Sequence, residues 1–301
     1  MQLRFDPAGA MPLAEARKPL SASREAAPGS VSTHLVPMLR TKLAQIERAE
    51  MRDWGALPFG DARINRCFPA GGLPFGRLHD ITGAGREQET PAVVTGFAAA
   101  LAARAMRGGV LLWALQRDDF YAPGLQAFGV DPDRVILVRV DKDDQAFAVV
   151  EDAARTRGVS AVVGEVSSLD LTAGRRLQLV CERSGATAFM LRRRLYAAPR
   201  TRSKHDEISS AATRWRIASA PSESEEPGLG PARCSVRLER NRGGRTGGWI
   251  MEMRNAAEAA CALRVVAELA DHAPAAELKD AKPRWPGHRN HDGERAVSGR
   301  G

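Results

Sequence analysis

Residues 71–83 read GGLPFGRLHDITG, and this stretch opens the regular part of the chain. Its separated glycines and proline predict a loop over 71–76, and the residues that follow predict a strand over 77–82. A short loop then leads to Pro91, which suits the first turn of a helix because the N–H there has no intrahelical partner. The stretch therefore predicts a strand, a loop and then a helix over 91–107.

The alternation of strands and helices continues downstream. Strands are expected over 109–115, 135–139, 159–163 and 186–191, and helices over 123–128, 144–157 and 172–184. Because these strands are near-continuous apolar runs separated by helices, they predict a mostly parallel sheet with helices on both faces. The fold class that follows is α/β.

The last third of the chain follows a different pattern. A polar loop is expected over 197–212 and a further strand over 214–220. Two alternating segments, 235–240 and 249–254, flank a glycine-rich tip, which predicts a C-terminal β-hairpin. A final helix is expected over 256–270.

Composition divides the chain into one folded domain and two tails. Residues 1–36 are rich in Ala, Pro, Ser and Arg, and residues 271–301 contain few large apolar side chains. Both segments are expected to be disordered, and the second is basic. Residues 37–55 predict an N-terminal helix or linker, which leaves 56–270 as a single domain.

The charge balance, the cysteines and the hydropathy narrow the class of protein. Forty-four basic and 36 acidic residues give a net charge of +8, which suits either a solubilising surface or a polyanionic partner. No two of the four cysteines form a C-x-x-C pair, so no metal site is expected, and reduced thiols fit a cytoplasmic protein. The most apolar helical run, 93–106, is too short to span a membrane.

Three motifs carry a resemblance to a known family. Residues 71–83, with the downstream order of elements over 56–268, resemble the segment that leads into the phosphate loop of RecA recombinases. The closer resemblance is to the ImuA family of RecA-like mutagenesis accessory proteins. It rests on LPFG at 57–60 upstream of Gly71, on ATRWRI at 212–217, and on RNRGGR at 240–245 before Trp249.

This resemblance implies a RecA-like core and a role in SOS-induced translesion DNA synthesis. The partners that it implies are an ImuB-type homologue of Y-family polymerases and, indirectly, an error-prone C-family DNA polymerase. RecA and single-stranded DNA are further candidate partners. The implied location is cytoplasmic, with nucleoid association during DNA damage.

The expected nucleotide pocket has lost residues that phosphate binding requires. A phosphate loop of the form G-x-x-x-x-G-K-[ST] wraps phosphates with backbone N–H groups, and its lysine neutralises them. In the matching run, 83–90, Gly83 and Thr90 fit, but Gln88 replaces the second glycine and Glu89 replaces the lysine. One like-charge contact at ~4 Å costs about 4 kcal/mol at an effective dielectric near 20.

Three other positions of the expected pocket bear on catalysis. In RecA an acidic residue after the second core strand activates water; here Gln116 falls near that place, and an amide cannot take a proton. Glu165 matches the metal-supporting aspartate in part, and Arg192 lies near the phosphate sensor. We therefore expect a pseudo-ATPase with no catalytic residues and no cofactor. Residual ATP and Mg²⁺ binding, with Arg86 or Arg192 in place of the lysine, stays open.

A basic pair precedes the hairpin tip. In RecA a matching pair reaches the nucleotide of the neighbouring subunit, so the resemblance implies that Arg240 and Arg242 face RecA and cap one end of a filament. A heterologous interface with only one competent face cannot propagate. The alternative is that both arginines cover a solvent-facing hairpin.

A second group of residues suits single-stranded DNA or a protein partner, because a basic loop there is flanked by one pair of aromatic rings. Its members are Arg193, Arg194, Tyr196, Arg200, Arg202, Lys204, Arg214 and Trp215. Three functions are weighed on these grounds. A non-catalytic adaptor of translesion synthesis is preferred over a nucleotide-dependent RecA-class DNA-binding ATPase, and a SulA-like cell-division inhibitor comes third.

Overall fold

The computed structural model describes residues 53–84, 90–193, 210–223, 230–259 and 261–269. Both expected tails and most of the expected 37–55 helix lie outside these residues. So do five residues of the expected phosphate loop, 85–89, and most of the polar loop at 197–212. No described helix is long and apolar enough to cross a membrane.

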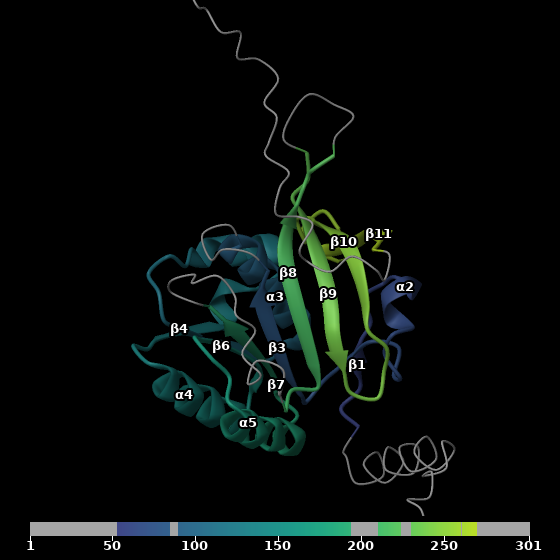
Figure 1. Cartoon of the computed structure of the whole chain (residues 1–301). Helices are drawn as coiled ribbons and strands as arrows, with labels where there is room; N and C mark the ends of the chain where they lie inside the picture. Colours follow the sequence, from purple (N-terminus) through teal and green to yellow (C-terminus); the bar gives the residue numbers. More distant parts are fainter. Residues whose placement is uncertain (1–52, 85–89, 194–209, 224–229, 260, 270–301) are drawn as a thin grey trace, which may run out of the picture. The chain divides into compact units, whose positions relative to one another are not determined.

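A nine-stranded sheet organises the described domain (Figure 1). Its strands are β3 (Leu78–Gly83), β4 (Val110–Leu115), β5 (Val135–Arg139), β6 (Val159–Val166), β7 (Thr187–Arg192), β8 (Thr213–Ala220), β9 (Arg233–Asn241), β10 (Gly247–Met253) and β11 (Leu263–Glu268). They lie in the order β11-β10-β9-β8-β3-β7-β6-β4-β5. Pairing is parallel from β8 to β5 and antiparallel from β8 to β11, which confirms the expected α/β sheet with a C-terminal hairpin.

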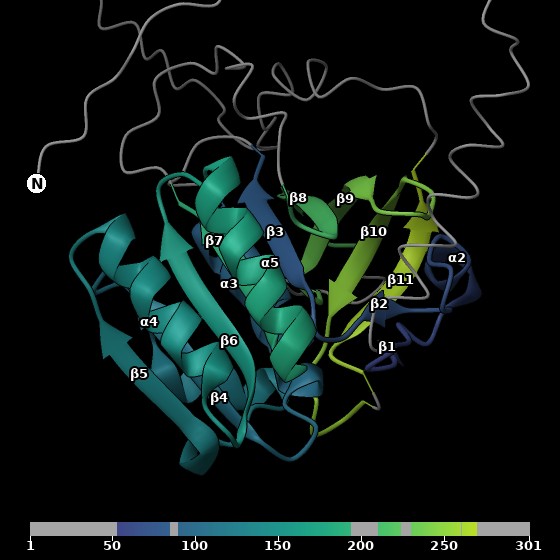
Figure 2. The ribbon, with the colours of Figure 1, turned by 90° about the horizontal axis from the view of Figure 1, so that it is seen from below.

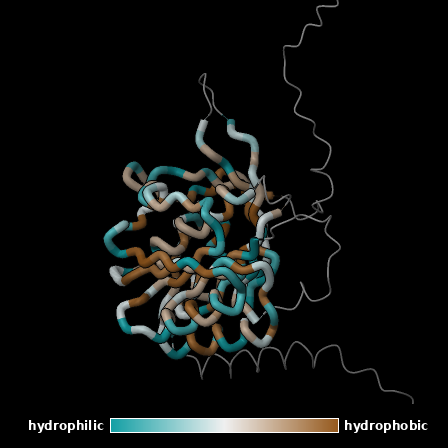
Figure 3. The backbone as a smooth tube through the Cα atoms, turned by 90° about the vertical axis from the view of Figure 1, so that its left-hand side faces the viewer, coloured by the Kyte–Doolittle hydropathy of each residue, from teal (hydrophilic) through white to brown (hydrophobic). Residues whose placement is uncertain are grey.

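Helices cover both faces of the parallel part of the sheet. Helix α3 (Pro91–Ala105) lies on one face, and helices α4 (Asp143–Arg155) and α5 (Leu171–Ser184) lie on the other (Figures 1 and 2). The core under α3 contains Phe97, Trp113 and Trp215, all fully buried. The core under α4 and α5 is a separate cluster. Hydrophilic residues mark much of the periphery of the domain (Figure 3). The apolar residues of the strands are buried in the two cores, which stabilises the fold.

Helix ends follow the caps that the sequence supplies. The Asp170 carboxylate accepts hydrogen bonds from two N–H groups of the first turn of α5, and Gly185 ends that helix at φ 83°. Helix α4 stops at Arg155, three residues before Gly158. The expected helix over 123–128 is a 3₁₀ helix, η2 (Ala122–Phe128), which ends at Gly129 in the left-handed region.

The expected final helix over 256–270 is wrong. A turn follows β10, and the chain then returns as β11, antiparallel to β10 along the edge of the sheet. In β11 the side chains of Leu263 and Val265 are buried against the α3 core, whereas Arg264 between them is exposed. The alanines favoured a helix, but pairing with β10 and burial of the alternate residues decide the structure.

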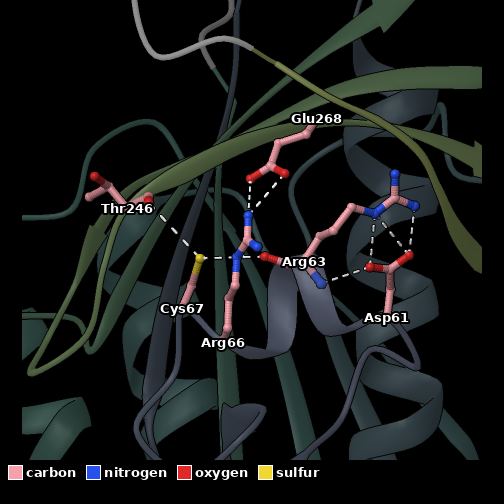
Figure 4. Close-up of polar contacts among 6 residues, drawn as sticks. All are labelled: Asp61, Arg63, Arg66, Cys67, Thr246 and Glu268. Atoms are coloured by element: carbon pink, nitrogen blue, oxygen red, sulfur yellow. Dashed lines mark hydrogen bonds and ion pairs between the residues drawn. The ribbon is translucent and has the colours of Figure 1, made fainter.

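A small N-terminal unit packs against the far edge of the sheet. It consists of β1 (Ala56–Leu57), α2 (Ala62–Asn65) and β2 (Leu73–Pro74), and β1 pairs with β2. Figure 4 shows how it is tied to the last strands: the guanidinium of Arg66 lies 2.7 Å from Glu268, and the thiol of Cys67 contacts the carbonyl of Thr246. This unit thereby fixes the antiparallel edge.

Candidate functional site

The carboxyl ends of the parallel strands meet at one edge of the sheet, and there the sequence predicted the degenerate nucleotide pocket. The two ends of the predicted phosphate loop lie close together, because a Cβ placed on Gly83 would be 2.6 Å from the hydroxyl oxygen of Thr90. Thr90 is buried at the start of α3. Gln88 and Glu89 lie outside the described residues, so their replacement of the glycine and lysine stays a prediction from sequence.

Glu165 stands at this edge near the end of β6, and its carboxylate is already occupied. One oxygen accepts a hydrogen bond from the backbone N–H of Gln116 at 3.1 Å, and the other lies 3.0 Å from the guanidinium of Arg193. Both charged side chains are nearly enclosed, with 1% of Glu165 and 7% of Arg193 exposed. The structure thus brings three predicted site residues together, but as partners of one another.

Two further carboxylates extend this arrangement, which we call the carboxyl-edge network. Asp119 pairs with the same Arg193 at 2.5 Å. The amide of Gln116 donates to Asp143 at 2.8 Å, and Asp143 in turn accepts hydrogen bonds from the N–H and hydroxyl of Ser167. Gln116 therefore links the end of β4 to the start of α4, and through Asp143 to the loop after β6.

The pKa shifts of these groups follow from burial and from their partners. Burial raises the pKa of Glu165, and the charge of Arg193 opposes that rise. Burial alone would lower the pKa of Arg193, but hydrogen bonding to Asp119 and the charge of Glu165 raise it overall. The pKa of Asp143 is lowered, because hydrogen bonds from Ser167 outweigh the opposite effect of burial. The charged groups of the network are therefore stabilised by partners within the protein itself.

Arg192 points to the opposite face and belongs to a separate ion triad. Its Nε donates to one oxygen of Asp80 at 2.8 Å, and the Nε of Arg214 donates to the other at 3.1 Å. The Asp80 side chain is 1% exposed. The expectation that Arg192 joins Glu165 around a nucleotide is therefore wrong, because neighbouring strand positions project to opposite faces.

Several residues expected to bind DNA or a partner serve the interior instead. Trp215 is fully buried, its ring contacts Phe59, Phe68 and Phe97, and its N–H donates to Thr213. It therefore cannot stack on a base, and the prediction for it is wrong.

Arg193 and Arg214, also expected at the DNA or partner surface, are committed to the buried carboxylates described above. The remaining members of that group, Arg194, Tyr196, Arg200, Arg202 and Lys204, lie outside the described residues.

The pair predicted to face RecA lies at the end of β9. Arg240 stands directly opposite Arg214 of β8, and Arg242 is exposed at the hairpin turn. Burial, and then the charges of Arg242 and Arg214, lower the pKa of Arg240. The two arginines share one end of the hairpin, and an anionic partner there would relieve the crowding of like charge.

Three carboxylates that matter here were not predicted: Asp80, Asp119 and Asp143. A signal existed only for Asp80, because a charged residue in an otherwise apolar buried strand requires an internal partner. Asp119 and Asp143 stand among other acidic residues in polar segments, where nothing in the local sequence separates a network member from a solvated side chain.

Comparison with known proteins identifies the family. No protein-family model matches the chain. Over 226 residues the chain is 45% identical to Protein ImuA of Caulobacter vibrioides, in each of two strains, and the match covers 73% of this chain and 92% of the relative. The chain belongs to the ImuA family. The resemblance to the ImuA family that the three motifs carry is thereby confirmed.

Proposed function

We propose that the protein is a non-catalytic adaptor in SOS-induced translesion DNA synthesis and acts through protein partners. Membership of the ImuA family supports involvement in inducible mutagenesis. The lack of catalysis is supported chiefly by one observation, the pairing of Glu165 with Arg193 and with the N–H of Gln116.

The argument against catalysis is energetic. Glu165 is the residue that would support Mg²⁺, and to do so it would have to give up Arg193 and the N–H of Gln116. Arg193, nearly enclosed, would then keep only Asp119, and this loss opposes metal binding by Glu165. Gln116 adds to this, because its amide donates to Asp143 and cannot act as a base. With Glu89 in the lysine position, three requirements of ATP hydrolysis are unmet.

The proposed partners follow from the family and from the exposed arginines. An ImuB-type Y-family polymerase homologue is the first, with an error-prone C-family polymerase reached through it. RecA is the second, met by Arg240 and Arg242, which would approach the nucleotide of a RecA subunit while this chain offers no competent pocket in return. Such an adaptor works in the cytoplasm and at the nucleoid during DNA damage.

A genetic experiment tests the adaptor role. Cells lacking the native gene are supplied with the wild-type chain, with T90V, or with R240E/R242E, and damage-induced mutation frequency is measured alongside protein abundance. We expect T90V to retain wild-type mutagenesis, since no hydroxyl is needed on a magnesium ion. R240E/R242E should fail to capture RecA in a pull-down from the same cells. Loss of mutagenesis in a normally abundant T90V chain would contradict the proposal and favour the ATPase.

A further inference from the structure

A basic hollow lies at the opposite ends of the strands from the carboxyl-edge network. The parallel strands begin there, and we call this side of the sheet the amino edge. The hollow has a volume of about 500 Å³, and it is formed by the turn after α3, the last turns of α4 and α5, and the first residues of β6. Arginines dominate its lining: Arg107, Arg155, Arg157 and Arg183. None of the described residues that line it is acidic.

The four arginines differ in their commitments. Arg155 pairs with Glu151 and Asp152 on its own helix. Arg107 donates to the carbonyls of Trp54 and Gly185 and lies over the ring of Phe75.

Arg157 and Arg183 are exposed, and neither makes an ion pair or side-chain hydrogen bond with a described residue. Two guanidinium groups are therefore available to a ligand.

The wall behind these arginines is rigid. The Trp54 ring is held between Gly76 and Gly185, since a Cβ at either glycine would lie within 2.7 Å of it. Its N–H donates to the carbonyl of Glu182 at 3.0 Å. Arg107, directly after the C-cap of α3, adopts φ 46°, an uncommon conformation for a residue with a Cβ, and its side chain reaches the carbonyls of Trp54 and Gly185. A preformed wall lowers the entropy that binding would otherwise lose.

The hollow combines two kinds of polar group. The guanidinium groups require an anion. The last turns of α4 and α5 also line it, and helix C-termini carry carbonyls without intrahelical partners and the negative end of the helix dipole. The dipole explains arginines at these helix ends, and a ligand there has to offer donors to the carbonyls as well as anions to the arginines. A peptide with carboxylate side chains offers anions to the arginines and N–H donors to the carbonyls.

The tails of this chain are poor candidates for the occupant. Both 1–52 and 270–301 contain more basic than acidic side chains, so neither complements a basic hollow. We propose that the hollow is a docking site for an acidic segment of a partner protein, with Arg157 and Arg183 pairing with its carboxylates. This inference rests on the proposed adaptor function, because it names a surface through which the adaptor meets a partner.

Binding of a glutamate-rich peptide to the full-length protein tests the inference. The probe is a short fluorescein-labelled peptide, and its fluorescence anisotropy is followed at physiological salt. The test variant is R157E/R183E. The control is R175E/R254E, which changes the net charge equally at exposed arginines outside the hollow. We expect R157E/R183E to weaken peptide binding by about tenfold or more, and the control by less than about twofold.

Three results would overturn the docking site: no peptide binding to the wild-type protein, equal weakening in both variants, or displacement of the peptide by a single-stranded oligonucleotide that loses affinity in R157E/R183E. The last would assign the hollow to nucleic acid. ATP turnover measured on the same preparations separates the two proposals. Turnover with the expected peptide result would remove the adaptor function alone, whereas no turnover with unchanged peptide binding would remove the docking site alone.

Discussion

The two edges of one sheet treat their polar residues in opposite ways. At the carboxyl edge, where the sequence predicted a nucleotide pocket, Glu165 is enclosed and bonded to Arg193 and to the N–H of Gln116. At the amino edge, Arg157 and Arg183 are exposed around a hollow without acidic lining.

The difference shows that the sequence position of a charged residue indicates its role only when the groups bonded to it are also known. Glu165 was expected to support a metal ion, yet in the structure its carboxylate is bonded to Arg193 and to the N–H of Gln116. Charges with no internal partner mark the surface that remains open to ligands. Substitutions of enclosed charges should therefore lower the free energy of unfolding. Substitutions of the exposed arginines at the amino edge should weaken ligand binding and change stability little.

The largest effect is expected where a buried carboxylate is removed. D80A leaves Arg192 and Arg214 without the anion that both contact, and we expect a loss of about 3–5 kcal/mol in the free energy of unfolding. The matched control is D118A, which breaks the exposed pair with Arg139 and should cost less than about 1 kcal/mol. Urea denaturation measures both; equal losses would remove the distinction between enclosed and exposed charge.

The next effect concerns His79 in β3, between the two edges. Its ring is fully buried, contacts Thr213 and the carbonyl of Pro74, and burial lowers its pKa from 6.5 to about 3. Because the unfolded chain binds this proton first, stability falls as the pH drops below 6.5, by about 1.4 kcal/mol per pH unit. Between pH 6.5 and 5, H79N should lose this dependence. An unchanged slope in H79N would assign the proton to another group.

A smaller effect should appear at the rigid wall of the hollow. Gly185 adopts φ 83° and touches the Trp54 ring, whereas Gly158 adopts φ 90° with no atom near a Cβ. G158A should cost about 1 kcal/mol for the left-handed backbone alone, and G185A should cost more because the ring must move. Thermal unfolding measures the difference. If the two variants are equally stable, Trp54 is not held as described.

The smallest effect is expected in R157E/R183E. We expect a loss below about 1 kcal/mol in the free energy of unfolding, because both side chains are exposed and the reversed charges meet only the C-terminal ends of α4 and α5. The same variant should lose peptide binding, so binding and stability separate at this edge. A large loss of stability would mean that both arginines have structural partners. The contrast between enclosed charges at the carboxyl edge and available charges at the amino edge would then be wrong.

The sequence predicted the sheet well because each strand is a local apolar run and several helices carry their own caps. Asp170 and Gly185 illustrate this, since each acts within a few residues of itself in sequence. The prediction failed for 256–270, where alanines favoured a helix but pairing with β10 produced a strand. Long-range pairing leaves little trace in a local pattern.

Gln116 and Glu165 were predicted for a nucleotide pocket, and Arg193 for a DNA or partner surface. Gln116, Glu165 and Arg193 were each chosen, yet their mutual bonding depends on how β4, β6 and β7 are ordered in the sheet. Trp215 was misjudged because a tryptophan between arginines resembles a stacking surface, whereas strand alternation turns it into the core. The amino-edge hollow was missed because its arginines lie far apart in sequence.

The most direct test of the central claim is ATP binding and hydrolysis by the purified full-length protein, with Mg²⁺, with and without single-stranded DNA and RecA. The wild-type protein, T90V and E165Q are measured together, with RecA alone as the reference for turnover. We predict no turnover beyond that of RecA and no difference among the three chains. DNA-stimulated turnover by the wild-type chain that falls in T90V and E165Q would contradict the account, because Glu165 would then have to leave Arg193 and serve a metal.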